Sequence, residues 1–411
     1  MSAAAGDSSR HRPGYRAAGR RVRLAFGTVV LPLVLATIAA EIILAVRERR
    51  PAHVVDGRLI APFPAENEAA VLRLRAKGVG AYPFVGPQQF VFRKDGAPTV
   101  SSGLFPLAGI SRTTTELCNE AGRDVLYASD EHGFNNPFEV WNGRRFDLAL
   151  IGDSFAHGVC VDSGNQLGTL IRNTIPATLN LGVLGAGPLA ELAVLREYAT
   201  PVRPRVVLWL FYEGNDIEDL VREEHSSLKM YLDPRLSQNL LTKQTTVDSL
   251  LRAYADSVLG GEVKMTPGVA DIGEMLRLSR VRKAVGMVAS NIPHRTAPSQ
   301  FATLARILLL AKQEVEAWGG RIYFVFLPDY HRFDRRVLAY SGYVHNNAEI
   351  QEGAMRAARN AGIPVIDVAA AFAASPNPRE YWPRSMSHYG PNGYALVART
   401  ILAALKKMPP G

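Results

Sequence analysis

The sequence predicts a three-layer α/β sandwich with a parallel sheet over residues 146–411. The first observation is a series of apolar, β-branched and aromatic runs, which fit strands buried on both faces of a parallel sheet. The second is that a helical pattern follows almost every run. The third is that glycines stand just after predicted helix ends, at Gly319, Gly320 and Gly362, where a left-handed residue often closes a helix.

The expected strands and helices alternate along the chain. Strands are expected over 146–151, 177–184, 205–212, 321–327 and 363–368, and helices over 166–175, 188–200, 301–318, 349–360 and 393–407. Pro188 suits the first position of its helix, because an N–H at that position would have no partner within the helix. Residues 218–300 interrupt the alternation and predict an insertion with an amphipathic helix over 276–287. An insertion placed after a strand often covers a site, and it can equally contact a partner.

The region before the α/β domain has a different composition. Residues 51–145 are rich in proline, glycine and other turn-forming residues, with one helical pattern over 66–77. The stretch 127–137 is especially dense in turn residues. This pattern predicts an irregular or β-rich N-terminal extension.

The basic charge of the chain is concentrated at its N-terminus. The net charge is +9, and residues 1–50 hold nine arginines against three acidic residues, so +6 of it lies there and +3 in the remaining 361 residues. A nearly neutral body gives no indication of a nucleic-acid partner. The sequence also contains no phosphate-binding loop and no nucleic-acid-binding module.

Residues 24–46 form an apolar run of 23 residues. A helix of this length spans the roughly 30 Å hydrocarbon core of a bilayer. Six arginines precede the run and three follow it, which favours a cytoplasmic tail over 1–23 and an extracytoplasmic body. We therefore expect a single-pass anchor in a bacterial-type inner membrane, with the body in the periplasm. A cleaved signal peptide and a buried soluble helix are the alternatives.

The chain has two cysteines, Cys118 and Cys160. In an exported body they can form a disulfide, and two buried thiols are the alternative. Neither they nor the scattered histidines have a metal-ligand spacing, so no metal or other cofactor is expected.

Polar and glycine-rich segments follow the expected strands. Ser154 comes directly after the first strand, Gly185 lies in a glycine-rich loop after the second, and Asn215 follows the third. His388 precedes the last helix. Since ligands bind at the carboxyl ends of parallel strands, these residues can form one site. Ser154 would be the nucleophile and His388 the base that takes its proton, while the N–H groups of Ser154 and Gly185 and the Asn215 amide would stabilise an oxyanion.

This ordered set resembles the SGNH/GDSL hydrolase superfamily. Its four blocks correspond to 152–155, Gly185, 214–216 and His388, over about 146–405. The resemblance implies a flavodoxin-like α/β/α fold and ester hydrolysis or acyl transfer through an acyl-serine.

One family position differs in this sequence. The family usually has an aspartate three residues before the histidine, where it orients the imidazole, and here that residue is Ser385. Three substitutes remain open: a backbone carbonyl on Nδ1, which leaves a Ser–His dyad, or the carboxylate of Asp367, or that of Asp329. An inactive, degenerate domain is also open, because a triad without its carboxylate loses orders of magnitude in rate.

Two functions follow as hypotheses. The first is a membrane-anchored esterase or O-acyltransferase that acts on an acylated small molecule or an envelope glycan. The second is a non-catalytic domain that binds a glycan or scaffolds an envelope assembly.

Overall fold

The computed structural model describes residues 28, 31–47, 50–55, 58–60, 65–91, 104–118, 123–142, 145–260, 262–266, 298–333, 341–383 and 388–407. The chain forms two compact units, Met1–Ala61 with Glu262–Ile292, and Pro62–Gly261 with Pro293–Gly411. The predicted helix over 276–287 lies outside the described residues.

Among its described residues, the first unit has a helix and a small antiparallel sheet. Its elements are α2 (Leu31–Arg47), β1 (Arg50–Val55), β2 (Arg58–Ile60) and β9 (Glu262–Thr266), and the strand order is β2-β1-β9. Several apolar side chains of α2 are exposed, among them Leu33 at 62%. Residues 24–27, 29 and 30 of the predicted membrane span lie outside the described part of the chain. Within the described part, no helix has both the length and the apolar character needed to cross a membrane.

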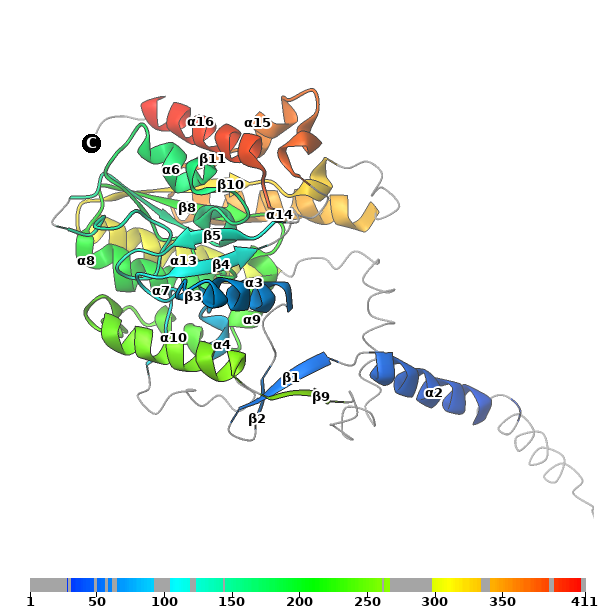
Figure 1. Cartoon of the computed structure of the whole chain (residues 1–411). Helices are drawn as coiled ribbons and strands as arrows, with labels where there is room; N and C mark the ends of the chain where they lie inside the picture. Colours follow the sequence, from blue (N-terminus) through cyan, green and yellow to red (C-terminus); the bar gives the residue numbers. More distant parts are fainter. Residues whose placement is uncertain are drawn as a thin grey trace, which may run out of the picture. The chain divides into compact units, whose positions relative to one another are not determined.

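The second unit contains a five-stranded parallel sheet, which confirms the predicted α/β class (Figure 1). Its strands are β6 (Leu148–Ile151), β7 (Thr178–Asn180), β8 (Val206–Tyr212), β10 (Arg321–Leu327) and β11 (Val365–Asp367). The order across the sheet is β11-β10-β8-β6-β7. Numbered along the chain, this is the 2-1-3-4-5 order of flavodoxin-like folds, whose ligands bind between the first and third strands.

Helices cover both faces of this sheet (Figure 1). One face carries α5 (Ser154–His157), α6 (Leu167–Arg172), α15 (Ala369–Ala373) and α16 (Pro391–Lys407), which pack with the strands into one apolar core. The other carries α7 (Pro188–Val194), α9 (Asp216–Glu223) and α13 (Pro298–Ala317), with α14 (Ser341–Asn360) packed against α13. Every residue of β6 is buried, and so is every residue of β8 and β10 except the first. This burial explains why the sequences of these strands are continuous apolar runs.

Some elements differ from the expected ranges. The helix predicted over 188–200 begins at Pro188, but it becomes π-helical over Leu195–Ala199 and ends in α8 (Thr200–Val202). Pro201 has no N–H to continue the helical ladder, which explains the irregular end. Within the predicted insertion, α10 (Gln244–Leu259) follows α9. Short 3₁₀ turns occur at Ser163–Asn165, Ser227–Leu232, Leu240–Thr242, Tyr330–Arg332 and Pro378–Tyr381.

Residues 62–145 of the N-terminal extension belong to the same compact unit as the α/β domain, whereas 51–61 belong to the first unit. Residues 62–145 contain α3 (Ala65–Ala76), α4 (Gln88–Val91) and a sheet of β3 (Ala81–Pro83), β4 (Thr114–Cys118) and β5 (Val125–Ala128). Asn136 links the two parts: its side chain accepts from the Asn180 N–H and donates to the Asn180 carbonyl, both at 2.8 Å. Asn135 donates to the His157 carbonyl at 2.9 Å. These buried bonds place the extension against β7 and α5.

Candidate active site

Ser154 is the first residue of α5, immediately beyond the carboxyl end of β6. The Asp153 carboxylate caps this short helix by accepting the Phe155 N–H at 2.8 Å. Gly152 permits the tight turn, since a Cβ there would lie 2.8 Å from the Ala156 Cβ and 3.0 Å from the Leu210 carbonyl oxygen. The turn therefore holds the Ser154 hydroxyl at the edge of the sheet.

His388 lies beside this hydroxyl, and its Nε2 is 2.9 Å from the Ser154 Oγ. The neighbouring Tyr389 fixes this segment, because its hydroxyl donates to the Pro328 carbonyl at 2.6 Å. The Phe155 ring lies against the imidazole, with the ring centroids 4.9 Å apart. A distance of 2.9 Å allows proton transfer from the hydroxyl to the imidazole.

The residues considered for orienting His388 are placed differently. Ser385 lies outside the described residues. Asp329 accepts from the Tyr212 hydroxyl at 2.7 Å and lies 2.7 Å from the His331 Nδ1. Asp367 accepts from the Ala369 N–H and from Gln351 Nε2. The hydrogen bonds of both carboxylates therefore go to residues other than His388.

A sulfur atom lies at the other nitrogen of His388. Cys118 and Cys160 are joined by a disulfide, with their Cα atoms 5.7 Å apart. The Cys160 Sγ is 3.8 Å from the His388 Nδ1. The histidine thus has the Ser154 hydroxyl at Nε2 and a disulfide sulfur at Nδ1.

The candidate oxyanion donors lie on the loops of neighbouring strands. Gly185 stands between β7 and α7, Asn215 between β8 and α9, and β6, which leads to Ser154, runs between β7 and β8. Gly185 has a φ of +74°, which favours glycine. The Asn215 amide donates to Asp219 at 2.8 Å, which fixes the rotamer and leaves its second N–H for a ligand.

The Gly185 loop is held from two sides. Gln88, on α4 of the extension, donates through Nε2 to the Gly185 carbonyl. The Glu223 carboxylate accepts from the Gly187 and Leu189 N–H groups, each at 2.8 Å. The loop that carries this candidate oxyanion donor is therefore held in place by the fold.

A group of buried carboxyls lies beneath these loops. Burial raises the pKa of Asp153 to about 6 and that of Glu223 to about 7. Burial, reinforced by repulsion from the neighbouring acids, raises the pKa of Glu191 and that of Asp216 well above the usual range. The folded state is therefore more stable relative to the unfolded state when these carboxyls are protonated.

Stability is expected to increase as the pH falls from 8 to 5.5. The pKa values of Asp153 and Glu223 are about 6 and 7 in the folded protein and about 4 in the unfolded chain. Each carboxyl therefore makes its full contribution to stability below about pH 4. That contribution is lost as the pH rises through 6 to 7. His157 and His132 act in the opposite sense, because burial lowers the pKa of both, that of His157 to about 3. The four carboxyls outnumber these two histidines, and we expect a net gain of about 1 kcal/mol or more.

Urea denaturation of the oxidised protein at the two pH values measures this difference. The Glu223→Gln variant serves as the control, because it removes one of the titrating carboxyls and should show a smaller difference between pH 8 and pH 5.5. Equal or lower stability of the unsubstituted protein at pH 5.5 would contradict the expectation.

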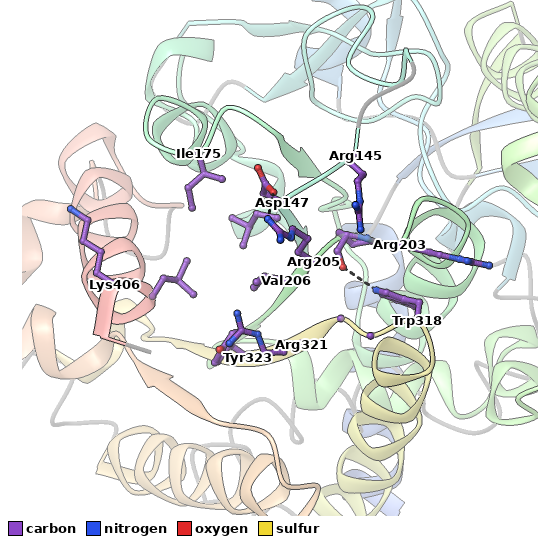
Figure 2. A pocket seen from close by; sticks show the side chains of 15 residues that line it. Arg145, Asp147, Ile175, Arg203, Arg205, Val206, Trp318, Arg321, Tyr323 and Lys406 are labelled. Atoms are coloured by element: carbon purple, nitrogen blue, oxygen red, sulfur yellow. Dashed lines mark hydrogen bonds and ion pairs between the residues drawn. The ribbon is translucent and has the colours of Figure 1, made fainter. Parts of the chain in front are cut away.

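A cavity of about 870 Å³ lies at the opposite, amino-terminal edge of the sheet (Figure 2). Its polar lining is mainly basic and comprises Arg145, Arg203, Arg205, Arg321 and Lys406, with Asp147 as the acidic member. Figure 2 shows Arg205 beside Asp147, and the two are 3.5 Å apart. The helices α13 and α16 end here, and cations near helix carboxyl ends balance the helix dipole. This cavity is separate from the Ser154 site.

Comparisons with known proteins give only distant likenesses. No family model matches the sequence, and no curated protein matches it. A lipase/acylhydrolase structure from Enterococcus faecalis is similar at 15% identity and a TM-score of 0.37, covering 64% of this chain and 95% of the other. A structure from Veillonella parvula, a member of the lipolytic protein G-D-S-L family, is similar at 13% identity and a TM-score of 0.33, covering 64% and 98%. Because the identities and TM-scores are this low, the similar structures do not establish a family. Any family assignment depends on the residues of the site.

Three neighbours of the site were not predicted from the sequence: Cys160 at His388, Gln88 at Gly185 and Glu223 at the Gly187 loop. A sequence signal exists for the first, because Cys160 follows Ser154 by six positions. The other two depend on contacts between distant segments.

Proposed function

We propose that this chain is a serine hydrolase or acyltransferase of the SGNH/GDSL type that acts on esters. The observation that carries the proposal is the 2.9 Å contact between the Ser154 Oγ and the His388 Nε2. It occurs beyond the carboxyl end of β6, beside the Gly185 and Asn215 loops, where flavodoxin-like sheets bind ligands.

The residues fit the chemistry of acyl transfer. The Ser154 oxygen attacks the ester carbonyl while its proton passes to the His388 Nε2. The carbonyl oxygen becomes an oxyanion, which accepts hydrogen bonds from the Ser154 N–H, the Gly185 N–H and the Asn215 amide. The carbon–oxygen bond of the ester then breaks, and the imidazolium returns the proton to the departing alcohol.

The acyl-serine is then released by the reverse sequence. A water molecule or an acceptor hydroxyl attacks it, giving up its proton to His388, and the Ser154 oxygen leaves and takes that proton back. Water gives an acid, and a hydroxyl gives a new ester. Product analysis in the presence of candidate acceptor alcohols separates hydrolysis from transfer.

A fluorophosphonate probe tests the proposal without knowledge of the substrate. The full-length protein in detergent is expected to form a covalent adduct at Ser154, which peptide mass spectrometry locates. The probe reacts because His388 activates the hydroxyl. No adduct under conditions that label a known serine esterase would reject the proposal and favour the non-catalytic, glycan-binding or scaffold alternative.

We further propose that residues 24–46 anchor the protein and that the site faces the periplasm. The apolar run and its flanking arginines support this orientation, and so does the disulfide, since disulfides persist in oxidising compartments. A reporter enzyme that works only outside the cytoplasm should be active when it is fused after Gly411. Activity of a fused reporter that works only inside the cytoplasm would overturn the orientation.

The substrate class that we propose is an O-acylated envelope glycan, and this rests on the proposed compartment. Four aromatic residues near the site are buried, at 7% exposure or less, and therefore belong to the core: Tyr212, Tyr330, Trp382 and Tyr389. Release of acid from, or transfer of acyl groups to, isolated envelope polysaccharide tests the class. Activity on small esters alone would reject it.

A further inference from the structure

The disulfide is part of the immediate surroundings of the proposed base. Cys118 ends β4 of the extension, and Cys160 follows the short helix that begins with Ser154. Cys160 has a φ of +66°, a left-handed conformation that costs a non-glycine residue about 1 kcal/mol or more. The fold thus maintains an unfavourable backbone conformation at the residue whose sulfur lies 3.8 Å from the His388 Nδ1.

The chemistry of a disulfide sulfur restricts which hydrogen bond it can form. It carries lone pairs and no proton, so it can only accept. A neutral imidazole has a proton on one nitrogen and a lone pair on the other. A sulfur that accepts at Nδ1 favours the tautomer with the proton on Nδ1, and this tautomer leaves the Nε2 lone pair for the Ser154 proton.

We propose that Cys160, as half of the disulfide, is a positioning residue that favours the productive tautomer of His388. It supplies an acceptor where the family resemblance leads one to expect a carboxylate but the sequence has Ser385. The inference rests on the proposed function of Ser154 and His388, and it adds the disulfide to that site.

A free thiol at the same place can also act in the opposite sense, because it carries a proton. Its S–H can donate to Nδ1, which places the imidazole proton on Nε2. If the thiol proton instead moves to the imidazole, a thiolate–imidazolium pair forms and Nε2 is protonated again. In both of these states Nε2 cannot accept the Ser154 proton. The thiol sulfur can also accept from Nδ1, as the disulfide does, so an unbonded Cys160 lowers the population of the productive tautomer and should reduce kcat.

Two single variants separate this effect from loss of the cross-link. Cys118→Ala and Cys160→Ala both remove the disulfide, but only Cys118→Ala leaves a thiol facing His388. We expect kcat of Cys118→Ala to be about tenfold or more below that of Cys160→Ala, with similar KM, because a wrong histidine tautomer can cost a serine triad up to about 10⁴ in rate. A purely structural role predicts equal losses.

A chemical rescue adds a second readout. Methyl methanethiosulfonate converts the thiol of Cys118→Ala into a methyl disulfide and releases methanesulfinate, so the sulfur becomes an acceptor without a proton. Because the chain has two cysteines, Cys160 is the only thiol that reacts in this variant. We expect kcat to rise at least about fivefold, while the same treatment of Cys160→Ala changes nothing.

The outcomes distinguish the two proposals. Equal kcat in the two variants, or no rescue, overturns the role of Cys160 while leaving the proposed function in place. Absence of both activity and fluorophosphonate labelling in the unsubstituted protein rejects the proposed function itself. If Cys118→Ala does not fold, the unsubstituted protein reduced with dithiothreitol and checked by circular dichroism replaces it. Its activity should fall on reduction and return on methylthiolation, and unchanged activity overturns the inference.

Discussion

Replacing Ser154 with alanine is expected to lower kcat for p-nitrophenyl acetate about 10⁴-fold or more. Removal of the nucleophile from a serine hydrolase leaves only the rate that the oxyanion donors and substrate binding provide. The fold should persist, because the change removes one oxygen atom whose hydrogen bonds go to His388 and Asp153. Initial rates on purified protein measure the effect.

Ser163→Ala is the matched control for this measurement. Ser163 is an exposed serine nine positions along the chain, in the 3₁₀ turn Ser163–Asn165, and full activity is expected. A Ser154→Ala variant that keeps more than about 1% of the activity would show that another group is the nucleophile.

Gly133→Ala is expected to destabilise the second unit by more than about 4 kcal/mol. Gly133 has a φ of +86°, and a Cβ there would lie 1.9 Å from the Gly109 carbonyl oxygen. The oxygen is a backbone atom and the Cβ is bonded directly to the backbone, so one of the two loops must move. Such a movement disturbs the turn that includes Asn135 and Asn136, through which the extension binds β7 and α5.

Gly78→Ala separates the steric clash from the cost of the backbone conformation. Gly78 has a similar φ of +80°, but nothing lies within 4 Å of its Cβ position. We expect this variant to lose about 1 to 2 kcal/mol, the cost of a left-handed alanine alone. Urea denaturation of both variants provides the comparison. Equal losses would mean that the Gly109 loop yields without cost.

Four strands of the sheet, β6, β7, β8 and β10, could be predicted because each is a run of mostly buried residues. In β11 only the central residue is buried, and its apolar sequence alone indicated the strand. Their order could not be read from the same pattern. The sequence alternates strand and helix, and this alternation is compatible with several arrangements of parallel strands. The prediction of Ser154, Gly185 and Asn215 did not need the order, because the carboxyl ends of parallel strands meet at one edge of the sheet.

The supports of the site were harder to predict because they join distant segments. The sulfur of Cys160 and the ring of His388 are 228 positions apart, and Gln88 and Gly185 are 97 apart. A periodic pattern within a short stretch of sequence does not indicate which distant segments come into contact. The buried carboxyls on α7 and α9 were missed for a different reason, since an acidic residue in a helix usually indicates a solvated face.

The hydrogen bonds of Asn136 have a consequence for where this chain can be truncated or fused to another protein. A fragment that begins at residue 146 would lack the Asn136 side chain that pairs with the Asn180 N–H and carbonyl, and the Gln88 amide that holds Gly185. The His157 carbonyl would lose its 2.9 Å bond from Asn135 and keep the 3.4 Å bond from Asn180. Buried backbone groups without partners cost about 1 to 3 kcal/mol each. The α/β half is therefore not a transferable module, and a gene fusion or truncation must carry the segment from Gln88 to Asn136 with it.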